Sequence, residues 1–287
     1  MPATKGFSLI ELLIALSIAL VLSAMMFQLF QQNERVIRDQ TIVMEMQQTA
    51  RIVMAQIADE VRMAGQGVPV YQSTLDTNLS EANAVFLATS SSSRIDFRAG
   101  LSNIATSVTT PPPLDFTIGV SRALSVMDGS GFPNGKFVFV SGEFAWSRCA
   151  LSAANPVSLI VTPRETGTTD NVVRFNSKPS ISLDEAISIY LNAGSVRRAT
   201  SADMTNSANP TWSAANEIGR NVAALNFTYF DQHGQQILPS SLQNRLSIAR
   251  VDIRVGVQAA STLSDGTRPS YSLALRTIPR NVRIRWP

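Results

Sequence analysis

The chain has 287 residues but only one cysteine and one histidine. Without a second cysteine, Cys149 cannot form an internal disulfide, so a domain outside a membrane must be stabilised by its own core. We expect Cys149 to be a buried small apolar residue. One histidine and one cysteine exclude zinc sites and Cys–His nucleophile pairs, and the sequence contains no Gly-x-Ser-x-Gly elbow. We therefore expect no enzymatic activity, no metal site and no cofactor.

Charged residues are also scarce, at 16% of the chain, and the formal net charge at pH 7 is +3. So small a net charge and so few charged residues do not indicate a surface that binds polyanions. The basic residues near the C-terminus are Arg276, Arg280, Arg283 and Arg285. Because the last two alternate with apolar residues, we interpret them as the solvated face of a final strand. A contact with DNA is the alternative, and nucleic acid is not among the partners we expect.

Two polar segments invite a functional interpretation that their spacing does not support. The segment Asp128–Lys136 has glycines and a lysine, but Phe137 follows where a phosphate loop needs a hydroxyl. It also lacks the acidic ladder of a calcium loop. His233 lies between two strand patterns and is followed by Gly234. We predict turns at both places.

Proline and glycine are absent from Phe7 to Ala64, which predicts one helix roughly 85–90 Å long. Up to Phe30 the helix is apolar on all sides and long enough to cross a bilayer. Its one charged residue is Glu11, and a charge in a membrane helix costs about 2.5–3.5 kcal/mol. A cut after Gly6 would place the amine of Phe7 one helical turn from this carboxylate.

Two ordinary interpretations of this segment remain alternatives. A secretory signal peptide has a basic start and an apolar core of about 7–15 residues, with a conceivable cut after Ser23 or Ala24. Glu11 interrupts that core, however, and the helical pattern continues beyond the cut. A plain single-pass anchor leaves Gly6 and Glu11 without a purpose.

Beyond Phe30 the helix becomes one-sided, which predicts packing against the sheet of the same chain. The residues of the apolar stripe are Val36, Val43, Met46, Ala50, Val53, Met54, Ile57, Val61 and Ala64. Gly65, Gly67 and Pro69 predict the end of the helix. The apolar first half has no comparable partner within the chain, so we expect lipid or other subunits to cover it.

The rest of the chain reads as short strands separated by turns. The expected strands are Val85–Thr89, Arg94–Phe97, Phe137–Val140, Val157–Thr162, Val172–Phe175, Ala186–Leu191, Val222–Phe230, Ile248–Val257 and Ser270–Ile278. Strict alternation in the last three indicates antiparallel strands with one buried face. Thr200–Ala215 is predicted to be a surface loop.

The run Gly6-Phe7-Ser8-Leu9-Ile10-Glu11 resembles the N-terminal signal of type IV prepilins and type II secretion pseudopilins. The segment Ala58–Gly65 and the strands of the last hundred residues are similar to minor pilins of the PilW type and to pseudopilin J. This resemblance implies an α+β, type IV pilin-like fold, with the long helix packed on an antiparallel β-rich domain. It divides the chain into a leader (1–6), a transmembrane half-helix (7–30), an amphipathic half-helix (31–65) and a β-rich domain (66–287).

The resemblance also implies a processing and assembly pathway. A prepilin peptidase would cut between Gly6 and Phe7 and methylate the new amine of Phe7, and Glu11 would pair with the amine of a neighbouring subunit. The implied partners are that peptidase, other minor pilins, the major pilin, the inner-membrane assembly platform and the lipid bilayer. The N-terminus would be cytoplasmic and the β-rich domain periplasmic, until the subunit joins the pilus.

One departure bears on the subunit's role. Major pilins commonly have a proline midway along the membrane part of the helix, and this chain has Gln28 there. We therefore expect a minor pilin that takes part in assembly, in a priming or tip complex. A minor pseudopilin of the J type and a tip adhesin or DNA-binding minor pilin are the alternatives.

Overall fold

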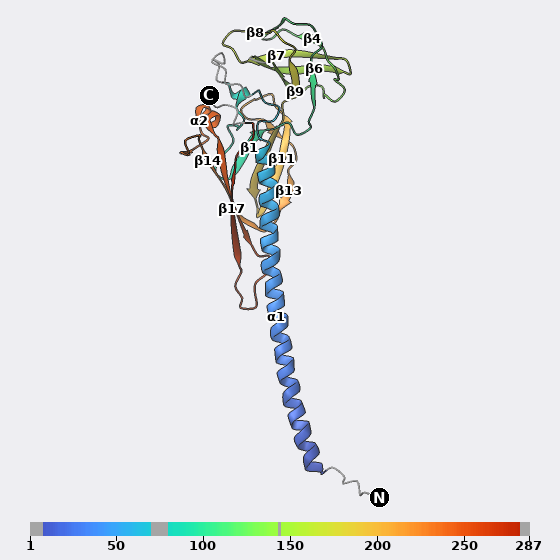
Figure 1. Cartoon of the computed structure of the whole chain (residues 1–287), viewed down its shortest axis with the longest axis vertical. Coiled ribbons are helices and arrows are strands. Elements are labelled where there is room, and N and C mark those ends of the chain that lie inside the picture. The colour runs from blue at the N-terminus through green and yellow to red at the C-terminus, as the bar shows by residue number, and fades with distance from the viewer. Residues whose placement is uncertain (1–7, 70–79, 143–144, 282–287) are drawn as a thin grey trace.

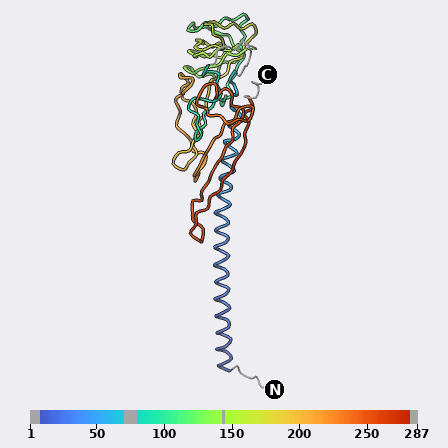
Figure 2. The backbone as a smooth tube through the Cα atoms, turned by 90° about the vertical axis from the view of Figure 1, so that its left-hand side faces the viewer, coloured from blue at the N-terminus to red at the C-terminus, as the bar shows by residue number. Residues whose placement is uncertain are grey.

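The computed structural model describes residues 8–69, 80–142 and 145–281. One long helix, α1 (Leu9–Arg62), projects from a β-rich body that lies around and beyond its C-terminal half (Figure 1). The view at 90° shows the N-terminal half of α1 standing clear of every other element (Figure 2). The predicted α+β fold, with a long helix followed by an antiparallel β-rich domain, is confirmed.

Local sequence determines both ends of α1. Ser8 is the N-cap, and its side chain and that of Glu11 form a capping box. The helix ends at Arg62, close to the predicted stop, and Gly65 follows with φ +85°. A Cβ on Gly65 would lie 3.1 Å from Cβ of Asn281 and 3.2 Å from Cγ2 of Val85. The positive φ therefore favours glycine there, and any larger residue would also crowd these two side chains.

The C-terminal half of α1 packs on the body, mainly on β16 (Arg250–Gln258) and β17 (Ser270–Thr277). The apolar stripe of α1 is buried from Met46 onwards, as predicted, and Val43 is half-buried. The prediction was wrong for Val36, whose side chain is 52% exposed. Among the described residues, the body reaches down the helix as far as Asp39, which the loop between β16 and β17 contacts through Ser264.

We call the body around α1 the stem, which contains two antiparallel sheets. The first sheet has the order β1-β10-β11-β12, with β13 also paired to β11. Its strands are β1 (Arg94–Arg98), β10 (Ala186–Asn192), β11 (Ser195–Asp203), β12 (Thr211–Trp212) and β13 (Asn216–Gly219). The second sheet has the order β15-β14-β16-β17, with β14 at Val222–Phe230 and β15 at Gln236–Ile237. A short helix, α2 (Leu242–Ser247), precedes β16.

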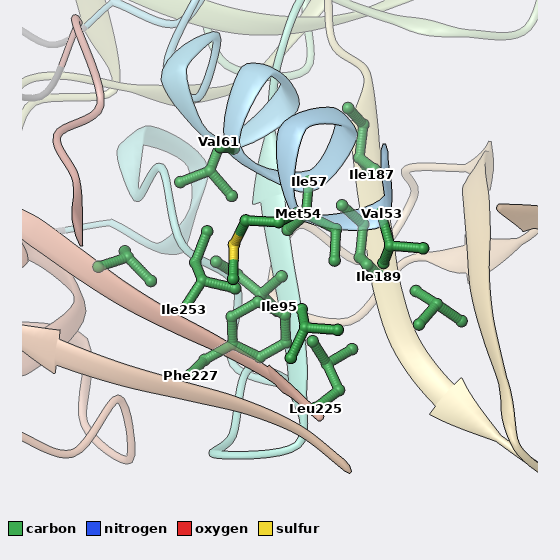
Figure 3. Close-up of a cluster of buried hydrophobic side chains, with 14 of the residues drawn as sticks. Val53, Met54, Ile57, Val61, Ile95, Ile187, Ile189, Leu225, Phe227 and Ile253 are labelled. Carbon is green, nitrogen blue, oxygen red and sulfur yellow. The ribbon is translucent and has the colours of Figure 1, made fainter. Parts of the chain in front are cut away.

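The core of the stem lies where α1 meets the two sheets (Figure 3). Met54, Ile57 and Val61 of α1 face Phe227 of β14 and Ile253 of β16, and all five are buried. Ile187 and Ile189 of β10 complete the cluster from the first sheet. Burying a side chain of this size stabilises a fold by about 1.5–3 kcal/mol. The helix is therefore part of the domain core and not merely attached to it.

A second unit, which we call the barrel, is inserted between β1 and β10, two strands that pair with each other in the stem. Six of its strands follow the order β2-β9-β5-β6-β7-β4. They are β2 (Ala105–Ser107), β4 (Arg122–Ser125), β5 (Phe137–Ser141), β6 (Trp146–Asn155), β7 (Ser158–Thr166) and β9 (Ser180–Leu183). A bridge between Val108 and Val126 joins the two ends of this sheet and closes it. Backbone bonds from Thr109 N to Ser125 O (2.8 Å) and from Met127 N to Ser107 O (3.0 Å) support the closure.

The barrel has its own hydrophobic core, separate from that of the stem. A ribbon of β3 (Leu114–Thr117) and β8 (Val172–Phe175) contributes Phe116 and Phe175 to this core. Figure 1 shows the barrel at the end of the molecule farthest from the start of α1. A short 3₁₀ helix (Glu81–Asn83) lies in the chain between α1 and β1.

Most of the expected strands are present, including Val222–Phe230 with the predicted bounds. Two expectations were wrong. Val85–Thr89 forms only a bridge between Phe86 and Phe97, and Thr200–Ala215 includes the end of β11 and all of β12. The sequence analysis also missed β2, β3, β4, β6, β9, β11, β13 and β15 as strands.

Candidate functional site

The first turn of α1 brings the predicted assembly residue into a defined geometry. The Ser8 backbone N–H donates to Oε2 of Glu11 at 3.0 Å, and the Ile10 N–H donates to Oγ of Ser8 at 3.3 Å. The carboxylate of Glu11 therefore lies at the positive end of the helix dipole, beside the backbone of Ser8, which follows Phe7 in the sequence. Gly6 and Phe7 themselves lie outside the described residues.

Glu11 is the one charged residue in an otherwise apolar surface. Between Leu9 and Phe30 every described residue of α1 is exposed in the isolated chain. In the described part of the chain, α1 is the one helix long and apolar enough to cross a membrane, with a mean hydropathy of 2.5 over 18 residues. Such a surface needs an apolar environment, which lipid or other helices can supply.

Asp39 marks where the stem begins to cover α1. The backbone N–H of Ser264 donates to Oδ1 of Asp39 at 3.0 Å, and the Ser264 hydroxyl donates to Oδ2 at 2.5 Å. Ser264 lies in the loop that joins β16 and β17, and Figure 1 shows this hairpin extending along α1 towards its N-terminal half. About nine residues of helix, or roughly 13 Å, separate Phe30 from this contact.

An ion pair that the sequence analysis missed fastens the upper part of α1 to the stem. Nε of Arg198 on β11 donates to Oε1 of Glu60 at 2.6 Å, and both side chains are largely buried. Burial raises the pKa of Glu60 above its ordinary value, and the nearby Arg198 guanidinium opposes that rise. The position of Glu60, a carboxylate close to the apolar stripe of the helix, was the signal in the sequence that could have predicted this ion pair.

A second missed feature is a buried ionic network between the stem and the barrel. Asp184 accepts from Nε of Arg98 on β1 at 3.0 Å and from Nε of Arg148 on β6 at 2.7 Å. Arg148 also donates to Glu165 on β7 at 3.0 Å. Arg98 donates further to the backbone carbonyls of Glu81, Ala84 and Ser207. Burial lowers the pKa of Arg98, and Asp184 opposes this shift.

The start of the chain, including the first turns of α1, is similar to a known family of sequences. Residues 1–27 match the Prokaryotic N-terminal methylation motif. This match supports a type IV pilin or pseudopilin family for the chain, a family whose proteins are structural. Together with the apolar first half of α1, the motif indicates anchoring in a membrane. The comparisons with curated proteins and with solved structures gave no match.

The other residues considered in the sequence lie away from the methylation motif. Cys149 is fully buried in the barrel core, which confirms the expected burial. Burial raises the pKa of its thiol to about 12. His233 is exposed in the turn between β14 and β15, and Asp128–Lys136 forms the loop before β5. Among the described residues no group of three or more His, Cys, Asp or Glu side chains could hold a metal ion.

The basic C-terminus is only partly described. Arg276 lies on β17 with an exposed side chain. Arg280 is also exposed, and its backbone N–H donates to the carbonyl of Arg62 at 3.1 Å. Arg283 and Arg285 lie outside the described residues.

Proposed function

We propose that this chain is a minor pilin of the PilW type that takes part in type IV pilus assembly, in a priming or tip complex. The observation that carries the proposal is Glu11, the one charge of an apolar helix that begins with a methylation motif. Gln28, where major pilins commonly have a proline, supports a minor rather than a principal subunit. The barrel, at the end of the molecule opposite the anchor, fits a subunit that caps a filament (Figure 1).

The mechanism is insertion of α1 into a bundle of similar helices. A prepilin peptidase cuts between Gly6 and Phe7 and methylates the Phe7 amine, so that a cation lies at the start of each mature helix. A carboxylate has two oxygens. Oε2 of Glu11 can keep its bond to the Ser8 N–H while Oε1 accepts from the amine of an adjacent subunit. Pairing removes the cost of an isolated charge in lipid and fixes how far one helix slides along the next.

The same mechanism defines the partners and the location. The mature subunit waits in the inner membrane with its N-terminus in the cytoplasm and the stem and barrel in the periplasm. Other minor pilins, the major pilin and the assembly platform then bind it, and it leaves the membrane with the growing fibre. Catalysis, cofactors and nucleic acid have no part in this role. A J-type pseudopilin of a type II secretion system is the second candidate, because the motif match supports pilins and pseudopilins alike.

The test is Glu11→Ala in a strain that produces pili, with Glu34→Ala as the control. Glu34 is an exposed carboxylate just beyond the apolar run. Because an unpaired charge in a membrane helix costs about 2.5–3.5 kcal/mol, its pairing should govern assembly. We expect Glu11→Ala to insert normally but to enter sheared pili at least tenfold less, and Glu34→Ala to enter at the wild-type level. Wild-type incorporation of Glu11→Ala would refute the role.

A further inference from the structure

Within the described part of the chain, the outer edge of β17 is a long strand edge with no strand paired to it. β17 has eight residues and, of the described strands, pairs with β16 alone. The other strands at sheet edges in the stem are protected by their shortness or by a neighbour. β12 and β15 have two residues each and β13 has four, and the Leu87 N–H donates to Asp96 O beside β1. Where β15 does not cover β14, the N–H groups of Val222 and Phe227 donate to Gly194 O and Ser92 O. In the barrel, the bridge between Val108 and Val126 closes the sheet.

The register shows which backbone groups of β17 face outward. β16 and β17 pair from Gln258↔Ser270 to Val251↔Thr277 without a shift. Beyond the strands, the Ala259 N–H donates to Pro269 O at 2.9 Å, which makes that pair a hydrogen-bonded one. Hydrogen-bonded pairs alternate along an antiparallel ladder. The residues that direct their N–H and C=O away from β16 are therefore Ser270, Ser272, Ala274 and Arg276.

The composition of β17 leaves this edge unprotected. Natural edges are usually protected by proline, by bulges, by several charges or by shortness. β17 has no proline and no register shift, and its one charged residue is Arg276. The apolar side chains of β17 on the α1 side of the sheet are also only partly covered. Tyr271, Leu273 and Leu275 pack against the stem core but stay partly exposed. A strand added beside them would cover these side chains.

The direction of β17 relative to the anchor limits what can pair with it. β17 starts after the loop that contacts Asp39 and ends shortly before Arg280, whose N–H donates to Arg62 O. It therefore runs alongside α1 and away from the anchor, as Figures 1 and 2 show. A second copy paired antiparallel to β17 would have its α1 pointing the opposite way. Two copies anchored in one membrane cannot adopt that arrangement.

Parallel pairing of two copies through this edge is also unfavourable. A two-fold axis along the strands would bring each outward N–H of β17 opposite the same N–H of the second copy. A donor cannot bond a donor, so neither symmetric pairing of two copies satisfies the edge.

We propose that the outer edge of β17 accepts an extended strand from a different protein held at the same membrane. The added strand runs antiparallel to β17, towards the membrane, and its backbone bonds the outward groups of Ser270, Ser272, Ala274 and Arg276. Its side chains alternate, with apolar residues extending the row of Tyr271, Leu273 and Leu275 and small polar residues on the solvent face. This inference rests on the proposed function, because it takes α1 to be a membrane anchor.

The test uses the full-length chain in native membranes, with a photo-crosslinking amino acid at Ser272. Ala274→Pro removes one outward N–H and leaves the bonds to β16 intact, and proline is tolerated in edge strands. Ala274→Ser is the matched control. We expect a cross-linked product whose mass is not twice that of the chain and whose attachment site lies in an extended segment of the partner. Ala274→Pro should reduce this product at least tenfold, and Ala274→Ser should leave it unchanged.

Leu273→Pro checks which backbone groups of β17 face β16 and which face outward, because the N–H of Leu273 faces β16. It should lower the unfolding temperature of the purified chain, whereas Ala274→Pro should not. A product of twice the chain mass, no product, or equal yields from Ala274→Pro and Ala274→Ser would overturn the proposal. If the chain is processed and enters pili without any product, the inference fails while the proposed function stands. If it is neither processed nor anchored, the proposed function fails.

Discussion

Nε of Arg198 on β11 lies 2.6 Å from Oε1 of Glu60, three residues before Met63 caps the long helix. The contact joins α1 to the first sheet of the stem across 138 positions of sequence. Because burial raises the pKa of Glu60, its ionised form is tolerated in the fold only with a cation beside it. This relationship makes the attachment of α1 sensitive to mutation and to pH.

Arg198→Met should destabilise the chain at pH 7 by about 1.5–3 kcal/mol, the range for hydrogen bonds to charged groups. A carboxyl group whose pKa is raised by folding weakens the fold as pH rises through that pKa, and the penalty disappears when the group is protonated. The deficit of Arg198→Met should therefore shrink as pH falls from 7 towards 4.5. Denaturant unfolding of the full chain in detergent at several pH values measures it.

The double variant Glu60→Gln with Arg198→Met supplies the control, because it removes the carboxylate that needs the cation. It should recover most of the stability at pH 7 and lose the pH dependence. An equal deficit for the single variant at every pH would show that lost packing, not an unpaired charge, is responsible.

Asp184→Asn should weaken the junction between stem and barrel. Asp184 lies between the buried guanidinium groups of Arg98 and Arg148, and removing one member of a buried ion pair typically costs about 3–5 kcal/mol. Asp115→Asn is the matched control, because its pair with Arg174 is largely exposed and screened by solvent, so its loss should have little effect on stability. Calorimetry should show a large loss of unfolding temperature for the first variant alone, and similar losses for both would contradict the assignment.

Gly65→Ala should destabilise the end of α1 more than Gly234→Ala does. Both glycines have a positive φ, so both substitutions strain the backbone by roughly 1 kcal/mol. A Cβ at Gly234 meets nothing within 4 Å, whereas at Gly65 it crowds Asn281 and Val85. The difference between the two unfolding free energies isolates the cost of crowding, and equal values would argue against close packing at this turn.

Gly6→Leu should block processing, because the resemblance to prepilins makes Gly6 the residue before the cut. The variant should accumulate as an uncut chain that migrates more slowly on a gel than the wild type. Pro2→Leu, which lies within the same leader but away from the cut, should be processed normally. Normal processing of Gly6→Leu would contradict the assigned cleavage site.

Local patterns predicted α1 and the later strands because the information lies within a few residues. The apolar stripe from Met46 onwards follows from helical spacing alone, and Val222–Phe230 follows from alternation. Val36 was misassigned because spacing shows which face is apolar but not how far the sheets extend along it. The loop at Ser264 sets that limit, 225 positions from Asp39.

The barrel could not be predicted because long-range pairing defines it. Its closure depends on the bridge between Val108 and Val126 and on pairing that holds β9 between β2 and β5. β6 was missed because serine and alanine make up half of it, and these have no strong strand preference. Arg98 and Arg148 show no local sign of burial, since their common partner Asp184 lies 86 and 36 positions away.

The N-terminal motif was the strongest functional signal, because six adjacent residues carry it and the fold does not alter its meaning. Glu11 could be singled out by its charge within an apolar run, and the structure adds the capping bond from Ser8. The pairing of Glu11 with another subunit concerns a second chain, so neither the sequence nor one folded chain contains that contact.

Mass spectrometry of the mature N-terminus, on the chain purified from its native membrane, tests the central claim most directly. The account predicts a chain that lacks residues 1–6, begins at Phe7 and carries one methyl group on its terminal amine. A chain that begins at Met1, or one that begins after Ser23 or Ala24, would contradict it.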